Sequence, residues 1–240
     1  MFELLFPFFL IVLFFLVLAI IWRNNARKYI SSGTVASAYD AWTQDKLLER
    51  LWGEHIHLGF YPSGKKNIDF RNAKVQFVHE LVKWSGLDKL PKGSRILDVG
   101  CGIGGSSRIL AKYYGFNVTG ITISPAQVKR ARELTPIGLN CNFQVMDALD
   151  LKFEDGSFDA VWSVEAGAHM NDKSKYADEM LRTLRPGGYL ALADWNSRDL
   201  RSYPPSIFER LVIKQLLEQW VHPNFISINE FADILKTNKN

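Results

Sequence analysis

The sequence of 240 residues has little cysteine, and its two cysteines, Cys101 and Cys141, lie in neither a CxxC pair nor another metal-type spacing. A disulfide framework is therefore not expected, and a reducing compartment fits this content. The sequence also lacks a basic run interleaved with aromatic residues, and its net charge is only +4, which argues against nucleic-acid binding. With 47% hydrophobic and 22% charged residues, it fits one folded α/β domain with an appendage.

Charged residues are absent from residues 4–22. As a helix this stretch would span about 28 Å, close to the hydrocarbon thickness of a bilayer. A cleaved signal peptide would begin with basic residues and end with small ones, whereas this stretch begins after Glu3 and ends in Ile-Ile-Trp. We therefore expect a transmembrane helix that contacts the lipid bilayer, with a signal peptide and a buried core helix as alternatives. The basic residues that follow predict a single-pass membrane protein whose remaining chain lies on the cytoplasmic side.

The rest of the chain divides by composition. Residues 30–35 are rich in serine and glycine, as in a linker, whereas residues 36–64 carry many aromatic and histidine side chains. From residue 94 onward, short apolar runs typical of strands alternate with helical patterns, which predicts a doubly wound parallel sheet. We expect a transmembrane anchor (1–22), a linker (23–35), a lid or substrate segment with the first helix (36–92), and a cofactor-binding core (93–240).

A glycine cluster, Leu-Asp-Val-Gly-Cys-Gly-Ile-Gly-Gly at residues 97–105, follows the first predicted strand of the core and opens a helix. Its glycines satisfy the G-x-G-x-x-G pattern of a dinucleotide site. Asp98 argues against that reading, because a carboxylate at the mouth of the loop repels a pyrophosphate. It would instead receive the ammonium group of a methionine moiety. The second strand also ends at residues 120–124 without the acidic residue that a dinucleotide ribose requires.

Two later signals agree with S-adenosylmethionine as the cofactor. Asp147 and Ala148 follow the third predicted strand, where they can receive the adenine amino group, and the Leu-Arg-Pro-Gly-Gly turn at residues 184–188 precedes the fifth. In this order, the signals identify a class I S-adenosylmethionine-dependent methyltransferase with a Rossmann-like α/β sheet. Such sheets normally have seven strands, and the sequence ends after the helix that follows the fifth. We therefore expect a truncated core that lacks the last two strands.

Residues 35–231 resemble the tocopherol-type methyltransferases. The resemblance implies transfer of a methyl group to a ring carbon of a prenylated benzoquinol in tocopherol and plastoquinone biosynthesis. The alternatives are a γ-tocopherol, sterol-type or fatty-acid-type methyltransferase, or a truncated, membrane-tethered protein that binds the donor without turnover. The matching blocks are residues 38–42, 52–59, 97–110, 115–130, 162–170 and 193–196.

The expected cofactor site combines the glycine cluster with the ends of the next strands. By similarity to cyclopropane-synthase and sterol-methyltransferase relatives, Thr122, Ile123 and Gln127 would contact the ribose, although Gln127 also fits a helix capping box. The cofactor-binding residues are then Asp98, Gly100, Gly102, Gly104, Thr122, Ile123, Gln127, Asp147 and Ala148.

A phenol ring carbon becomes a better nucleophile when the hydroxyl loses its proton, so a base near that hydroxyl would help. Glu165 and His169 follow the fourth predicted strand, where a doubly wound fold places reactive groups, and are the catalytic candidates. For Glu165, orienting the donor or holding the lid is the alternative. His55 and His57 would share one face of an extended segment, and we expect no metal there because a third ligand is missing. The substrate or lid candidates are Tyr39, Trp42, His55 and His57.

Overall fold

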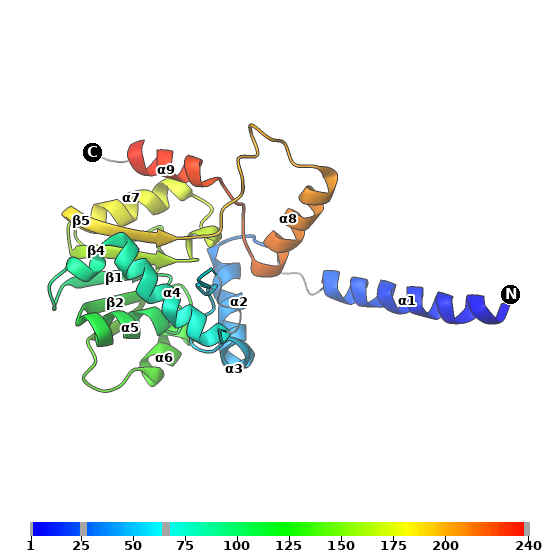
Figure 1. Ribbon diagram of the computed structural model, residues 1–240, viewed down its shortest axis with the longest axis horizontal. Coiled ribbons are helices and arrows are strands. Elements are labelled where there is room, and N and C mark those ends of the chain that lie inside the picture. The colour runs from blue at the N-terminus through cyan, green and yellow to red at the C-terminus, as the bar shows by residue number, and fades with distance from the viewer. Residues whose placement is uncertain (1, 25–27, 64–67, 238–240) are drawn as a thin grey trace.

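The computed structural model describes residues 2–24, 28–63 and 68–237. In this part of the chain, five strands form one parallel sheet in the order β3-β2-β1-β4-β5 (Figure 1). The predicted α/β Rossmann-like architecture with a parallel sheet is thereby confirmed. The strands are β1 (Arg95–Val99), β2 (Asn117–Thr122), β3 (Cys141–Val145), β4 (Phe158–Val164) and β5 (Leu184–Ala193).

Helices cover both faces of this sheet (Figure 1). Successive residues of β1 point to opposite faces, as the pleat of a strand requires. Ile96 packs in one core cluster with α4 and α5, and Leu97 packs in another with α7 and α9. Burial on both faces explains why the central strands β1 and β4 consist largely of apolar residues. These helices are α4 (Phe70–Ser85), α5 (Gly105–Tyr114), α7 (Lys173–Thr183) and α9 (Ile228–Thr237), and α6 (Pro125–Leu134) packs on β3.

The strand order reverses between β1 and β4. Asp98 of β1 pairs with Trp162 of β4, while β2 and β5 continue the sheet on opposite sides. In an open parallel sheet, ligands bind beyond the carboxyl ends of the strands at such a reversal. The segments after β1 and β4, which begin at Gly100 and Glu165, meet at this point.

The fifth strand begins earlier than expected. We predicted a turn at residues 184–188, but β5 already starts at Leu184. Phe158 pairs with Leu184 and Ala160 with Tyr189, so the residues between form an irregularity in the ladder. A bulge of this kind accommodates extra residues, including Gly187 at φ +74°. The expected turn sequence is therefore an irregular part of the strand.

The segment before the core is more ordered than a linker. Helix α2 (Ser32–Gln44) begins inside the predicted linker of residues 23–35, and α3 (Leu47–Trp52) follows. The backbone N–H of Ser31 donates to Thr34 Oγ1 at 3.2 Å, which stabilises the first turn. Val35 is buried and packs with Val221, the residue after α8 (Ile207–Trp220). Residues 32–35 are thus part of the fold, a correction to the predicted linker.

Helix α1 (Phe2–Asn24) extends away from the α/β domain (Figure 1). Crossing a bilayer takes about 20 consecutive apolar residues, and no helix among the described residues is long and apolar enough to do so. The expectation of a transmembrane helix is therefore wrong, and so is that of a single-pass protein with its catalytic domain on the cytoplasmic side.

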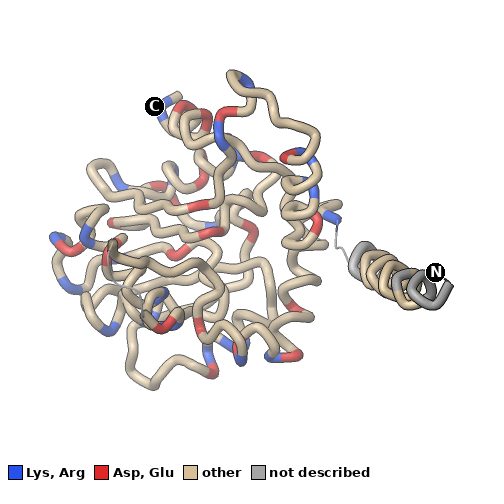
Figure 2. Tube along the Cα trace, turned by 45° about the vertical axis from the view of Figure 1, so that its right-hand side comes forward, with Lys and Arg blue, Asp and Glu red and all other residues tan. Residues whose placement is uncertain are grey.

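Charged residues of both signs are interspersed over the α/β domain (Figure 2). Several form ion pairs between elements that are distant in sequence. Arg130 of α6 binds Glu49 of α3 at 2.6 Å, and Arg108 of α5 binds Glu54 at 2.6 Å. These pairs attach α3 and the segment after it to the core, beside the carboxyl edge of the sheet.

Candidate active site

The loop after β1 needs glycine at several positions. Gly100, Gly102 and Gly104 have φ values of +77°, +54° and +81°, a region that other residues rarely adopt. A Cβ on Gly100 would lie 2.3 Å from the Cβ of Ala166, whereas one on Gly102 would meet no atom closer than Gln127 Nε2 at 4.0 Å. Gly100 thus allows the two loops to pack, and Gly102 leaves backbone open to a ligand.

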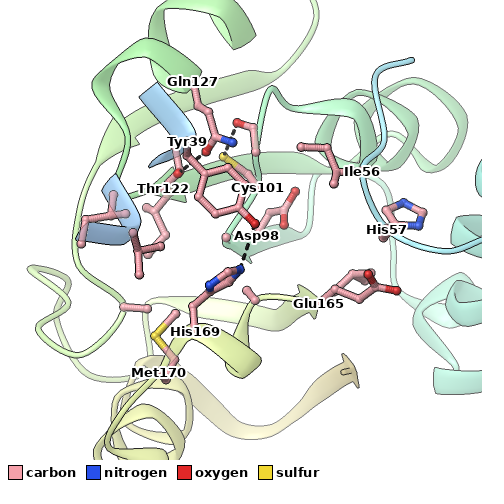
Figure 3. Close-up of a pocket in the computed structure, with 18 of the residues that line it drawn as sticks. Tyr39, Ile56, His57, Asp98, Cys101, Thr122, Gln127, Glu165, His169 and Met170 are labelled. Carbon is pink, nitrogen blue, oxygen red and sulfur yellow. Dashed lines mark hydrogen bonds between the residues drawn. The ribbon is translucent and has the colours of Figure 1, made fainter. Parts of the chain in front are cut away.

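A cavity of about 330 Å³ lies beyond the carboxyl ends of β1, β2 and β4 (Figure 3). Its size is at the lower end of the range for small-molecule sites. Of the residues expected from the sequence, all but two line it. Gly104 lies behind the loop, where a Cβ would meet Phe143 at 2.7 Å. Trp42 packs edge to face on Tyr39 at 5.2 Å and so supports the wall without lining it.

Asp98 is the carboxylate at the centre of this cavity (Figure 3). Asp98 is only 2% exposed, and Ser107 Oγ donates a hydrogen bond of 2.5 Å to its Oδ2. Burial raises the pKa of Asp98 to about 7, and the hydrogen bond opposes that shift. A cation bound beside Asp98 would stabilise its charged form. The residue therefore fits the ammonium group of a methionine moiety.

The next part of the wall comes from the end of β2 and the start of α6. Thr122 Oγ1 donates to Gln127 Oε1 at 2.6 Å, and both residues line the cavity. The helix cap is supplied by Ser124, whose Oγ accepts from the Gln127 backbone N–H at 3.1 Å. The Gln127 side chain thus faces the cavity instead of the helix end. Asp147 follows β3 in the same wall and accepts from the Leu149 N–H at 2.9 Å.

Glu165 connects three parts of the site. Its Oε1 accepts from the backbone N–H of Leu58 at 2.9 Å, and its Oε2 accepts from Trp195 Nε1–H at 2.8 Å. Burial raises the pKa of Glu165, although these two hydrogen bonds lower it in part. The residue adopts φ +53°, an uncommon conformation for a residue other than glycine. Glu165 thus holds residues 53–60, which we name the lid loop, against the core, because its Oε1 binds Leu58 of that loop and its Oε2 binds Trp195 of the segment after β5.

His169 lies opposite Glu165 in a short helical turn, η2 (Gly167–His169). The Tyr39 hydroxyl donates to its Nε2 at 2.8 Å (Figure 3). This arrangement assigns the proton of the neutral ring to Nδ1, which lies 3.4 Å from the Val221 carbonyl oxygen. Burial lowers the pKa of His169 to about 4 and raises that of Tyr39 well above its ordinary value. At neutral pH the His169 ring is therefore uncharged and accepts a hydrogen bond, and the Tyr39 phenol keeps its proton.

The lid loop presents its two histidines to the cavity. His55 Nδ1 and His57 Nε2 are 3.1 Å apart, and His57 Nδ1 donates to the Leu58 carbonyl at 2.7 Å. Burial lowers their pKa values to about 3 and about 4. The side chain of Lys74 supports the loop by donating to the His55 carbonyl at 2.8 Å. The two histidines share one face, as the sequence predicted, and they bond to each other.

Several residues that line the cavity lie outside the sequence patterns that predicted the site. Tyr29 and Ser32 lie in the predicted linker, and Trp220 and His222 lie at the end of α8 and just after it. His222 is only 7% exposed and packs edge to face on His169, with ring centroids 4.4 Å apart. Its Nδ1 is buried without a hydrogen-bond partner among the described residues. Tyr29 and Ser32 reach the site at the start of α2, whereas His222 reaches it only through the return of the chain after α8.

Comparisons with known proteins place this geometry in context. Residues 97–192 match a family described as a methyltransferase domain. The chain is 57% identical over 233 residues to 2-methyl-6-phytyl-1,4-hydroquinone methyltransferase of Synechocystis, covering 97% of this chain and 73% of that protein. It is 36% identical over 203 residues to the chloroplastic tocopherol O-methyltransferase of Arabidopsis thaliana, covering 80% of this chain. It thus spans about 58% of the length of that relative.

A solved structure shows the same fold. Geranyl diphosphate C-methyltransferase from Streptomyces coelicolor, in complex with S-adenosyl-L-homocysteine, superposes with a TM-score of 0.67. The match covers 87% of this chain and 78% of that one at 22% sequence identity. The likeness concerns the fold, including the parallel sheet at whose carboxyl edge the cavity lies.

Proposed function

Because this chain belongs to the family of S-adenosylmethionine-dependent methyltransferases that includes 2-methyl-6-phytyl-1,4-hydroquinone methyltransferase, we propose that it methylates a ring carbon of a prenylated benzoquinol. The family membership confirms the resemblance drawn from the sequence, and with it S-adenosylmethionine as the cofactor. When bound, this cofactor supplies a methyl group on a positively charged sulfur. The identity of the quinol rests on the 57% identity to the Synechocystis protein.

The residues of the cavity fit this donor. Asp98 would bind its ammonium group and Gly102 would let the backbone approach the methionine moiety, while Gly100, which also lines the cavity, lets the loop pack against Ala166. Thr122 and Gln127 would contact the ribose, since a hydroxyl and an amide can both bond to a diol. The end of β3 would contact the adenine. The remaining cofactor candidates are Ile123, Asp147 and Ala148, which line the same wall, while Gly104 supports the loop from behind.

The pair of Tyr39 and His169 is the observation that carries the proposal for catalysis. The imidazole of His169 is uncharged at neutral pH, because burial lowers its pKa, and its Nε2 lone pair already accepts the Tyr39 hydroxyl. The substrate hydroxyl would donate to the Tyr39 oxygen while Tyr39 passes its own proton to His169. This transfer raises the electron density of the ring carbon that takes the methyl group. The carbon then loses its proton to solvent while the proton held on His169 returns through Tyr39 to the substrate oxygen, so that the aromatic ring and its hydroxyl are both restored.

Glu165 has a different part in this scheme. Because its Oε1 binds Leu58 of the lid loop while its Oε2 binds Trp195 after β5, it acts by holding the lid loop over the cavity. A closed loop excludes water and fixes the positions of the two reactants, which supplies much of the rate acceleration of a methyl transfer. Of the two catalytic candidates, we therefore assign proton transfer to His169 and positioning to Glu165.

The test is transfer of a radiolabelled methyl group to a panel containing a prenylated benzoquinol, a tocopherol and a sterol. We expect labelled quinol from the wild-type protein and a loss of about 10²-fold or more in kcat for His169→Gln. His79→Gln is the matched control, because His79 bonds to Tyr114 outside the cavity. Label in the tocopherol alone would favour the activity named for the Arabidopsis relative. Donor binding without any labelled product would leave a binding protein without turnover.

A further inference from the structure

A second hollow adjoins the catalytic cavity. It is an open groove of about 490 Å³ between Tyr29 and the helix α8. Its apolar wall contains Leu200, Ile213, Leu217 and Pro223, which come from α8 and from the segments before and after it. We call this hollow the α8 groove.

The α8 groove adjoins the catalytic cavity, because Tyr29 and His222 line both. The ring of His222 packs on that of His169 with a centroid distance of 4.4 Å. The inner end of the groove is therefore one aromatic ring away from the catalytic histidine. A ligand whose head is held at His169 can extend past His222 along α8.

The size of the catalytic cavity requires such an extension. At about 330 Å³ it is small for one drug-sized ligand, and it has to take the donor and the quinol ring together. A prenyl chain adds a long apolar segment that cannot also be enclosed there. The α8 groove offers this chain an apolar wall. Its charged lining residues are Lys28, Arg210, Lys214 and Glu218, and the stems of the basic ones can cover apolar surface.

We propose that the α8 groove binds the isoprenoid tail of the quinol, with Ile213 and Leu217 as the residues that select for it. This inference rests on the proposed function. It assigns a substrate subsite to a groove that the resemblance to other methyltransferases did not indicate. Tail length then affects the KM of the substrate through α8, while the chemistry at the ring depends on Tyr39 and His169.

The test compares two substrates and two variants. The substrates are a phytylated benzoquinol in detergent and the same ring with a methyl group in place of the tail. The variants are Ile213→Asp and the matched control Val212→Asp, a neighbour on the same helix that is 42% exposed and outside the groove. For Ile213→Asp we expect KM for the phytylated quinol to rise at least about tenfold, the effect of losing about two buried methylene contacts. We expect no change on the tail-less quinol, and none for Val212→Asp on either substrate.

A measurement on the wild-type protein guards against a variant that fails to fold. A phytylated quinol that carries a photoactivatable diazirine near the end of its tail should label the peptide of α8, as read by mass spectrometry. Labelling elsewhere, or an unchanged KM in a folded Ile213→Asp protein, would overturn the groove assignment while the methylation of the quinol stands. If the wild-type protein methylates neither quinol, the proposed function itself is wrong and the tail assignment falls with it.

Discussion

Replacing Asp98 with asparagine should stabilise the free protein above pH 7 while weakening its binding of the methyl donor. Burial raises the pKa of this carboxyl from its ordinary value of 3.8 to about 7. Below pH 3.8 the group is protonated in both the folded and the unfolded protein. As the pH rises from about 4 to 7, the unfolded chain loses the proton and the folded protein keeps it, so the free energy of unfolding falls. Above pH 7 the folded protein bears the whole cost of a buried charge.

The magnitude follows from the two pKa values. Their difference, at about 1.36 kcal/mol for each pH unit, corresponds to about 4 kcal/mol above pH 7. The carboxamide introduced by Asp98→Asn would still accept the Ser107 hydroxyl, but its N–H groups would lack partners, which costs about 1–3 kcal/mol. We therefore expect Asp98→Asn to raise the free energy of unfolding by about 1–3 kcal/mol at pH 8, with the gain shrinking and then reversing toward pH 4. Urea unfolding followed by circular dichroism between pH 4 and 8 measures this difference.

Calorimetry on the same proteins measures the cost to binding. Losing a hydrogen bond to a charged group weakens binding by about 1.5–3 kcal/mol, or roughly 10- to 150-fold. Ser107→Ala is a control for which we expect the opposite change in the free energy of unfolding. It removes the hydrogen bond that stabilises the Asp98 carboxylate and so lowers stability above pH 7. A pH-independent difference between Asp98→Asn and wild type would refute the argument from burial. Unchanged donor affinity would remove Asp98 from the cofactor site.

Substitutions at four further residues test the rest of the site. Tyr39→Phe removes the hydroxyl that bonds to His169 and should lower kcat about 10²-fold while the affinity for the donor stays unchanged. An unchanged kcat would exclude Tyr39 from the proton path. Glu165→Ala leaves two hydrogen-bond donors unpaired and should lower the free energy of unfolding by about 1–3 kcal/mol, with faster proteolysis in the lid loop, whereas Glu165→Gln should show a smaller effect. Gly104→Ala forces a Cβ to 2.7 Å from an aromatic ring and should unfold the protein at a lower temperature. Gly102→Ala has room for its Cβ, so it should lower the free energy of unfolding by only about 1–2 kcal/mol, the cost of the left-handed backbone. It should nevertheless weaken donor binding, as measured by calorimetry. An equal loss of stability in the two glycine variants would contradict the separate roles given to Gly102 and Gly104.

The class of fold and the cofactor were readable from the sequence because their signals are local. The alternation of strands and helices from residue 94 onward appears in the hydropathy pattern of short windows, and the structure confirms the parallel sheet. The glycine cluster follows β1 directly, so its chemistry could be inferred from Asp98 and the spacing of its glycines. Local signals failed where neighbours in space decide the outcome, as at Leu184, which joins β5 by pairing with Phe158.

The arrangement of the catalytic groups was decided by the tertiary structure alone. Tyr39 and His169 are 130 positions apart, and Leu58 and Glu165 are 107 apart, yet each pair forms a hydrogen bond. The sequence marked Glu165 and His169 as equal candidates, because both follow the same strand. Packing of α2 and the lid loop onto the carboxyl edge of the sheet gives them different hydrogen-bond partners, on which the different roles proposed for them rest. His222 reaches the cavity only through the turn after α8, and no local pattern could reveal it, since long-range packing alone sets where that turn lies.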